Sequence, residues 1–251
     1  MTGETHEYGQ DDMAHDLPRA EIVDRIEWLT AQCVGKRVVH VGFADAGFRQ
    51  QQGRAGRWLH GHLHEVASEL VGIDADPAGA AAAAEDGFET YVVDCTDAAA
   101  VAALGIEPAD IVLAGEVIEH VGAPGPFLEA LHHLCKPDGT LIVTTPNAYG
   151  LVNVVASVFR RVEVNHPDHV MMFTWRTLTE LMRRSGWDHA RTVTYVPSVR
   201  ERGSRSRLEA AGVRLVVGCE RLLGRLNRPF SADGLIVSAT PADRPVPTVA
   251  E

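Results

Sequence analysis

The sequence has few cysteines, no long apolar run and no continuous stretch of positive charge. Its four cysteines lie far apart and form no Cys-x-x-Cys pair, a pattern typical of a reduced protein rather than a disulfide-stabilised one. No apolar run approaches the roughly 20 residues that span a bilayer, and the first residues contain no signal-like apolar segment. We therefore expect a cytoplasmic location and no membrane segment.

Positive charge is sparse and scattered. The net charge is −11, and the arginines that do cluster are confined to Arg160-Arg161, Arg183-Arg184 and the segment 200–207. Binding to a nucleic-acid backbone requires a basic face that neutralises several phosphates. Nucleic acid is therefore not an expected partner.

What the sequence does contain is an alternation of short apolar runs and helix-like segments along 251 residues, of which 45% are hydrophobic. The expected strands lie at 37–42, 70–74, 90–94, 109–114, 140–145, 192–196 and 235–239. The expected helices lie at 18–34, 58–70, 77–85, 98–104, 126–135, 151–159, 173–185 and 207–223. Strands that alternate with helices at this spacing form βαβ units. The sequence predicts an α/β protein with a doubly wound, seven-stranded, mostly parallel sheet.

The two ends of the chain differ from its middle. Residues 1–17 are polar, acidic and rich in histidine, which is typical of a flexible arm, and residues 242–251 are Pro-rich, which is typical of a disordered tail. Residues 18–241 are expected to form one domain. Within it, the segment around 148–172 interrupts the regular alternation and is expected to act as a lid.

One stretch combines acidic and imidazole side chains at the end of an expected strand. The apolar run 109–114 is followed by Gly115, Glu116, Glu119 and His120, and open α/β sheets bind ligands at the carboxyl ends of their strands. If the stretch is helical, its two carboxylates and its imidazole lie at i, i+3 and i+4 and share one face. Such a set suits Mg²⁺ or Mn²⁺. The alternative interpretation is that the acids only complement the dipole of a helix.

The order of these elements resembles that of the class I S-adenosylmethionine (SAM)-dependent methyltransferases. In that family an acid, one spacer and a Gly-x-Gly-x-Gly turn follow the first strand, and the second strand ends in an acid. Here the turn contains His40 instead of the acid and Ala44 and Ala46 instead of two glycines, whereas Asp74 ends the second strand as expected. The resemblance implies that SAM contacts His40, Gly42, Ala44, Asp74, Asp94, Cys95 and Gly115.

The same strands allow two other interpretations. A dinucleotide-binding dehydrogenase requires an intact Gly-x-Gly-x-x-Gly turn and an acid about 20 residues later. Neither feature is present. The gap between the first turn and the acid Asp74 is longer here, because residues 49–57 form an extra segment after the first expected strand. Because the cofactor turn departs from the family pattern, a methyltransferase-like binding module without activity also stays open.

The acidic stretch is similar to the Glu-x-x-Glu-His motif of two metal-dependent groups in this family. These are the small-RNA 3′-terminal 2′-O-methyltransferases and the ubiquinone-biosynthesis O-methyltransferases, in which a further histidine after the fifth strand completes the site. The resemblance implies that Glu116, Glu119, His120 and His169 hold Mg²⁺ or Mn²⁺. His166 is then available for another role, and His166 or His120 is a candidate to accept the substrate proton.

A cation that chelates two neighbouring oxygens selects a vicinal diol as the methyl acceptor. The three candidate acceptors are a sugar, the 3′-terminal ribose of RNA and a catechol-like quinone precursor. The negative charge disfavours RNA, and the lack of an amphipathic helix with a basic face disfavours a quinol in a membrane. We therefore expect a small-molecule or oligosaccharide substrate, with a sugar or glycosylated metabolite favoured. The sequence leaves a homodimer open.

Overall fold

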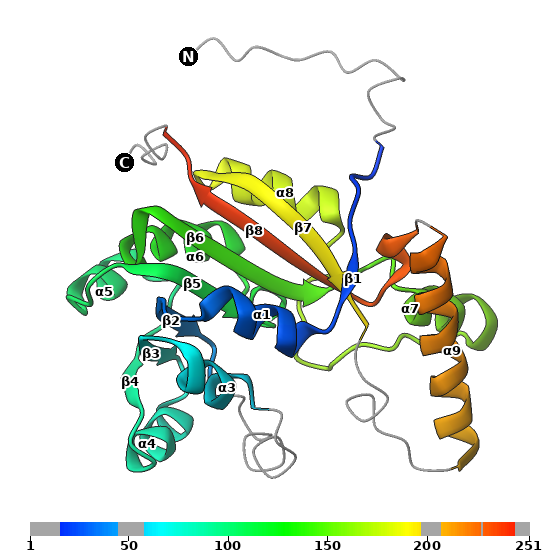
Figure 1. Ribbon diagram of the computed structural model, residues 1–251, viewed down its shortest axis with the longest axis horizontal. Helices are drawn as coiled ribbons and strands as arrows, with labels where there is room; N and C mark the ends of the chain where they lie inside the picture. The colour runs from blue at the N-terminus through cyan, green and yellow to red at the C-terminus, as the bar shows by residue number, and fades with distance from the viewer. Residues whose placement is uncertain (1–15, 45–57, 197–206, 227, 244–251) are drawn as a thin grey trace.

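An eight-stranded sheet runs through the centre of the protein (Figure 1). The computed structural model describes residues 16–44, 58–196, 207–226 and 228–243. The strands occur in the order β1-β7-β8-β6-β5-β2-β3-β4. They are β1 (Ile22–Val23), β2 (Arg37–Val41), β3 (Glu69–Asp74), β4 (Glu89–Val92), β5 (Ala109–Gly115), β6 (Cys135–Pro146), β7 (Trp187–Tyr195) and β8 (Gly234–Pro241).

Helices cover both faces of this sheet. In Figure 1, α1 and α3 lie in front of it, and α6 and α8 lie behind it. The α-helices are α1 (Arg25–Cys33), α3 (Leu59–Val66), α4 (Pro77–Glu85), α5 (Ala98–Ala103), α6 (Pro124–Ala130), α7 (Leu151–Val155), α8 (Trp175–Arg184) and α9 (Arg207–Arg225). Shorter helical turns are η2 (Ile118–His120), η3 (Leu131–Leu134), η4 (Ala156–Arg160, a π-helix) and η5 (Pro229–Ser231).

The predicted α/β class is confirmed, and the strand count is eight rather than seven. All neighbouring strands pair in parallel except β8, which is antiparallel to both β6 and β7. The additional strand is β1, which lies inside the segment expected to be one helix, 18–34. The helix starts only after Asp24, whose side chain accepts a hydrogen bond from the Glu27 backbone N–H, because residue 22 instead pairs with Thr194 of β7.

The alternation of apolar side chains along the strands builds two core layers. In β2, Val39 and Val41 belong to the layer packed under α5, α6 and α8, whereas Val38 belongs to the layer packed under α1 and α3. Successive side chains of a strand point to opposite faces, and a parallel strand covered on both faces is apolar throughout. The carboxyl ends of β2, β3, β5 and β6 therefore meet at one edge, which is left for polar and ionisable groups.

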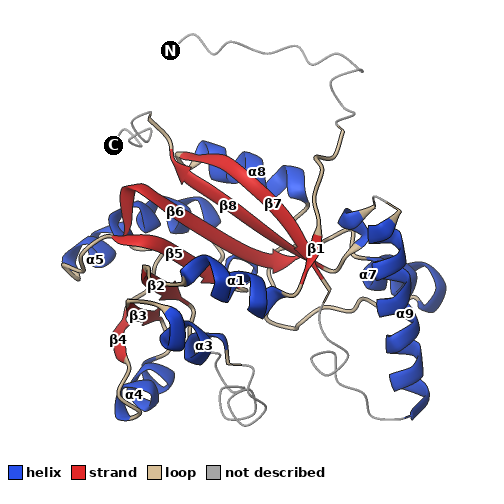
Figure 2. Ribbon diagram, in the orientation of Figure 1, coloured by secondary structure: helices blue, strands red, loops and turns tan. Residues whose placement is uncertain are grey.

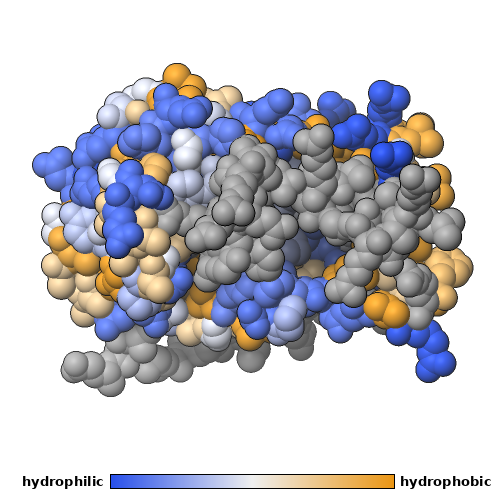
Figure 3. Space-filling view, turned by 90° about the horizontal axis from the view of Figure 1, so that it is seen from below, coloured by the Kyte–Doolittle hydropathy of each residue, from blue (hydrophilic) through white to orange (hydrophobic). Residues whose placement is uncertain are grey.

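The segment expected to be a lid contains much of the exposed apolar surface. It runs from β6 through α7 and η4 to α8, and its first part lies beside α9 at the right of Figure 2. More than half of the large exposed apolar side chains among the described residues belong to it: Tyr149, Val154, Val158, Phe159, Val162, Val164 and Val170. Seen from below, the described surface is a mosaic of hydrophilic and hydrophobic residues (Figure 3).

Several expectations concern residues outside the described ranges. The flexible arm at 1–17, the tail at 242–251 and the extra segment at 49–57 fall mostly or wholly there, and they stay predictions. Among the described helices, none combines the length and the apolar character needed to cross a bilayer.

Gly42, which follows β2, is under two separate constraints that predict a large cost of substitution. Its φ is +73°, and a Cβ there would lie 2.1 Å from Cγ2 of Val117. We expect Gly42→Ala to lower the free energy of unfolding by about 1–2 kcal/mol for the left-handed backbone and by about 1–3 kcal/mol more for overpacking. Gly87→Ala is the matched control, because Gly87 has φ +91° but open space around it. Equal losses for the two variants in urea unfolding would show that the Val117 contact is unimportant.

Candidate functional site

The carboxylate of Asp74 joins the first turn to the end of β3. Its Oδ2 accepts a hydrogen bond of 2.9 Å from the Ala44 backbone N–H, and its Oδ1 accepts one of 2.9 Å from the Asp76 backbone N–H. Gly42 precedes this turn in the left-handed conformation. The structure therefore brings Gly42, Ala44 and Asp74 together, as expected, whereas the rest of the turn, 45–47, lies outside the described residues.

His40 lies inside β2 at the position of the acid in the family that the sequence resembles. It is 3% exposed, and its Nδ1 lies 3.1 Å from Nδ1 of His60. Burial, and then the neighbouring His60 and Arg25, hold the pKa of His40 well below its usual range. A Cβ on Gly115 would lie 3.7 Å from Nε2 of His40, so the expected cofactor residues His40 and Gly115 are close neighbours at the ends of β2 and β5.

Asp94 and Cys95 follow β4 and lie near Asp74. Asp94 is exposed, and its Oδ1 accepts hydrogen bonds from the backbone and the hydroxyl of Thr96, which lower its pKa. Cys95 is buried, and burial, followed by the charges of Asp94 and Asp74, raises the pKa of its thiol to about 12. The thiol is therefore protonated and chemically inert at neutral pH.

Glu116 lies outside any helix, so the helical arrangement considered for Glu116, Glu119 and His120 does not form. The helical part is only the 3₁₀ turn Ile118–His120, and Glu116 has a left-handed φ of 57°. Its Oε1 accepts a 2.8 Å hydrogen bond from the Thr144 hydroxyl and a 2.7 Å bond from the Tyr195 hydroxyl. A strained backbone conformation of this kind persists where surrounding contacts impose it, and here β6 and β7 supply those contacts.

Glu119 is a fully buried carboxylate with one oxygen left without a hydrogen bond. Its side chain is 0% exposed, and Oε2 accepts a 3.0 Å bond from the Thr145 hydroxyl. Oε1 has no hydrogen-bond partner among the described residues and lies 4.0 Å from Nε2 of His169. Burial, followed by the charge of Glu116, raises the pKa of Glu119 to about 8. An isolated buried carboxylate is costly, so this oxygen requires a proton or a cation.

His169 presents a lone pair toward that oxygen. Its Nδ1 lies 2.6 Å from Oδ1, the side-chain oxygen of Asn165. This oxygen only accepts hydrogen bonds, so Nδ1 carries the proton and Nε2 has the lone pair. Burial, and then His120 and His166, lower the pKa of His169, which favours the neutral ring. Two acceptors that face each other at 4.0 Å are the arrangement that a cation between them would satisfy, so these residues fit a divalent metal.

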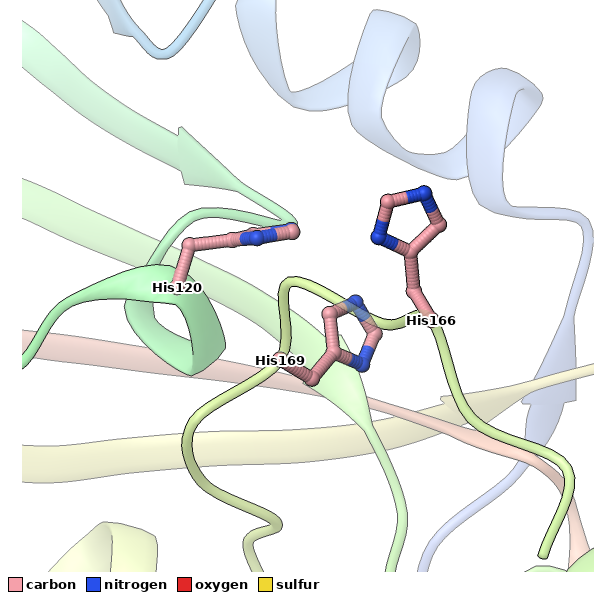
Figure 4. A group of neighbouring side chains, drawn as sticks. All are labelled: His120, His166 and His169. Atoms are coloured by element: carbon pink, nitrogen blue, oxygen red, sulfur yellow. The ribbon is translucent and has the colours of Figure 1, made fainter.

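Three histidines converge at the same place, and one of them was not expected to be a ligand. Among the described residues, His120, His166 and His169 each offer a ring nitrogen, and these three atoms lie within 4.8 Å of one another (Figure 4). Glu116 and Glu119 do not belong to this tight group, although the Glu119 carboxylate faces His169. The structure thus brings Glu119, His120 and His169 together and adds His166. Glu116 lies outside the tight group but close enough for its charge to shift the pKa values of Glu119 and His169.

Backbone hydrogen bonds fix the loop that carries His166 and His169. The His169 N–H donates to the His166 carbonyl at 3.1 Å and closes a turn over Pro167. The N–H groups of Val170 and Met171 then donate to the Glu119 carbonyl, at 2.9 and 3.2 Å. The loop is therefore attached to η2 by main-chain bonds, which positions the histidines independently of side-chain packing.

A cavity of about 390 Å³ opens beside these groups. The ionisable residues of its wall are Glu116, His166, His169, Tyr195 and Asp233. A second cavity of about 300 Å³ shares Asn153, Val164, Asn165 and Met172 with it. Most of the remaining wall of the first cavity is apolar and includes Pro146, Val152, Val164, Pro167 and Met172. The space suits a molecule with a polar group at the histidines and an apolar part beside the lid.

Three residues of this region were not found by reasoning from the sequence. Tyr195 holds Glu116, Asn165 orients His169, and the Arg25 guanidinium lies 5.7 Å from the centre of the Tyr195 ring. A Cβ on Gly115 would lie 3.3 Å from that guanidinium, so Arg25 places a positive charge beside both Gly115 and Tyr195. None of the three belongs to a motif, because tertiary packing alone brings β7, α1 and the loop together.

Sequence comparison with known proteins finds relatives over part of the chain. A ubiquinone biosynthesis O-methyltransferase of Cereibacter sphaeroides is 33% identical over 144 residues, which are 54% of this chain and 58% of that protein. One of Ruegeria pomeroyi is 32% identical over 174 residues, which are 64% of this chain and 69% of that protein. The match to the first relative thus spans less than two thirds of its length.

Solved structures share the fold at low sequence identity. A SAM-dependent methyltransferase from Thermotoga maritima superposes with a TM-score of 0.56 at 14% identity, over 86% of this chain and 87% of that one. One from Archaeoglobus fulgidus gives 0.51 at 15% identity, over 85% and 93%. The methyltransferase-domain family matches residues 52–191, more than half of the chain. With the sheet and the site described above, these matches show that the chain belongs to the methyltransferase-domain family and has the α/β fold of SAM-dependent methyltransferases.

Proposed function

We propose that this protein is a SAM-dependent O-methyltransferase that methylates one hydroxyl of a vicinal diol with the help of a divalent cation. The observation that carries the proposal is the pair of facing acceptors, Glu119 Oε1 and His169 Nε2, 4.0 Å apart beside the cavity. Glu116, Glu119, His120 and His169 are the proposed ligands. When bound, the cation would lower the pKa of a substrate hydroxyl and fix its orientation.

The proposed cofactor half is formed by residues at the carboxyl ends of β2, β3 and β4. Asp74 still has lone pairs for the two ribose hydroxyls after it has accepted its two backbone bonds. Asp94 and the Cys95 backbone would contact the adenine, and Gly42 and Ala44 leave the backbone close to the cofactor because they have little or no side chain. Arg25, beside Gly115, offers a positive charge to the carboxylate of the cofactor's methionine part.

For the acceptor, a sugar or glycosylated metabolite is the candidate that the charge of the chain favours. The cavity wall supports a second candidate, a catechol with an apolar substituent, because Val152, Val164 and Met172 face the space beside the histidines. The relatives named ubiquinone biosynthesis O-methyltransferase support the same candidate. Both acceptors present two adjacent oxygens, so the proposed chemistry is the same.

A panel of paired acceptors tests the reaction. The purified protein is incubated with labelled SAM and Mg²⁺ or Mn²⁺, and with a catechol, a neutral sugar diol or a short RNA with a free 3′-terminal ribose. Each acceptor is paired with a derivative in which one of the two hydroxyls is absent. We expect methylation of a diol and a loss of at least about 100-fold for its single-hydroxyl partner. Equal turnover of both members of a pair would contradict chelation.

Salt distinguishes RNA from the neutral acceptors in the same assay. Turnover of a neutral sugar or catechol is expected to change less than about twofold between 50 and 200 mM salt, whereas RNA methylation would fall steeply because phosphate contacts release counterions. Efficient methylation of the RNA, with no turnover of the small acceptors, would overturn our choice of substrate class.

A further inference from the structure

We infer that His166 is a ligand of the proposed cation rather than a proton acceptor, so that three imidazoles and the Glu119 carboxylate form a site that prefers Mn²⁺, Co²⁺ or Zn²⁺ over Mg²⁺. The inference rests on the proposed function and extends it to the identity of the metal. It starts from the convergence of ring nitrogens of His120, His166 and His169 within 4.8 Å. Rings that bind one ion need their nitrogens about 3–3.5 Å apart, given metal–nitrogen distances of about 2.1 Å, so small side-chain rotations complete the set.

The orientation of His166 supports this role. Figure 4 shows a nitrogen of the His166 ring turned toward His120 and His169. The backbone N–H of Asp168 donates a long hydrogen bond of 3.3 Å to Nδ1 of His166. A cation bound at this nitrogen would replace that weak bond and would be shared with the ring nitrogens of His120 and His169.

The histidines are also fixed in advance of binding. His166 and His169 lie at the two ends of one hydrogen-bonded turn, and Asn165 holds the outer nitrogen of His169 at 2.6 Å. The next residues are bonded to the Glu119 carbonyl, which keeps the turn beside His120. Hydrogen bonds of this kind to the second nitrogen orient metal-binding histidines and strengthen their affinity.

The donor set determines which metal is bound. Mg²⁺ prefers oxygen ligands and keeps several of its waters, whereas imidazole nitrogen suits the transition metals. A site with Glu119 and two histidines would have a mixed set of oxygen and nitrogen ligands. A third imidazole makes nitrogen the dominant donor. Glu116, whose Oε1 already accepts bonds from Thr144 and Tyr195, then contributes through its other oxygen or by its charge alone.

Metal binding measured without substrate tests this assignment. Calorimetry with Co²⁺, Mn²⁺ and Mg²⁺ alone, together with the visible absorption of the Co²⁺ form, is applied to the wild type and to His166→Ala, Glu119→Gln and His133→Ala. His133 is an exposed histidine outside the site and serves as the control. We expect the wild type to bind Co²⁺ and Mn²⁺ at least tenfold more tightly than Mg²⁺. His166→Ala should lose at least tenfold in Co²⁺ affinity and change the Co²⁺ absorption, and His133→Ala should behave as the wild type.

The outcomes separate the two proposals. If Glu119→Gln loses Co²⁺ but His166→Ala keeps both wild-type affinity and spectrum, then His166 is not a ligand, and the metal-assisted function stands. If His166→Ala lowers methyl transfer without changing metal affinity, then His166 acts as a base in the wild type and the inference is wrong. If the wild type binds none of the three cations yet methylates a diol, both the inference and the metal-assisted mechanism fail.

Discussion

Glu119→Gln is expected to reduce methyl transfer by at least about 100-fold while SAM affinity changes by less than about twofold. The substitution keeps the size of the side chain and its bond from Thr145, but it replaces the carboxylate oxygen that faces His169 at 4.0 Å. Loss of even an outer partner of a metal ligand typically costs 10–100-fold, and a ligand itself costs more. Exhaustive chelation of the wild type should produce the same pattern.

The fold should tolerate this change. A neutral amide relieves the burial of charge and the repulsion from Glu116 that raise the pKa of Glu119, so the melting temperature should stay the same or rise. Glu85→Gln, at an exposed position at the end of α4, is the matched control and should keep full activity. Full turnover after chelation, or an active Glu119→Gln, would rule out the metal mechanism and leave a metal-free base, His120 or His166, as the better account.

Asp74→Asn is expected to weaken SAM binding at least roughly tenfold, since each charge-assisted bond to a ribose hydroxyl contributes about 1.5–3 kcal/mol. Asparagine has one acceptor oxygen in place of two, so the variant also loses one of the bonds from Ala44 and Asp76. Calorimetry with SAM gives the dissociation constant, and thermal unfolding separates loss of affinity from loss of fold.

The matched control for this variant lies two residues away. Asp76 caps α4 by accepting a bond from the Ala78 backbone N–H, a role that asparagine fills nearly as well. Asp76→Asn removes the same charge from the same edge of the sheet, and it should change SAM affinity by less than about twofold. An unchanged dissociation constant in folded Asp74→Asn would remove Asp74 from the cofactor site.

The sequence alone determined the alternation of strands and helices, because the period of apolar side chains depends on local geometry. It also pointed to the acidic stretch, because that stretch follows an apolar run at the carboxyl end of an expected strand, and it pointed to Asp74 through the resemblance to methyltransferases. It missed β1, since two residues that pair with a distant strand carry no local signal, and it left open whether the acidic stretch is helical. The contacts of Glu116 with Thr144 and Tyr195, from β6 and β7, decide that Glu116 is not helical.

Tertiary structure alone decided how the site is assembled. The direction in which a loop histidine points depends on main-chain hydrogen bonds between its loop and another segment. Here those are the bonds from the Val170 and Met171 N–H groups to the Glu119 carbonyl. Such bonds leave no pattern in the sequence. For the same reason only the structure shows that His166 joins His120 and His169. It also shows that Arg25, from α1, lies over the ring of Tyr195, from β7. Residue types and spacing specify which chemistry is available, and the packing of distant strands and loops determines which groups meet.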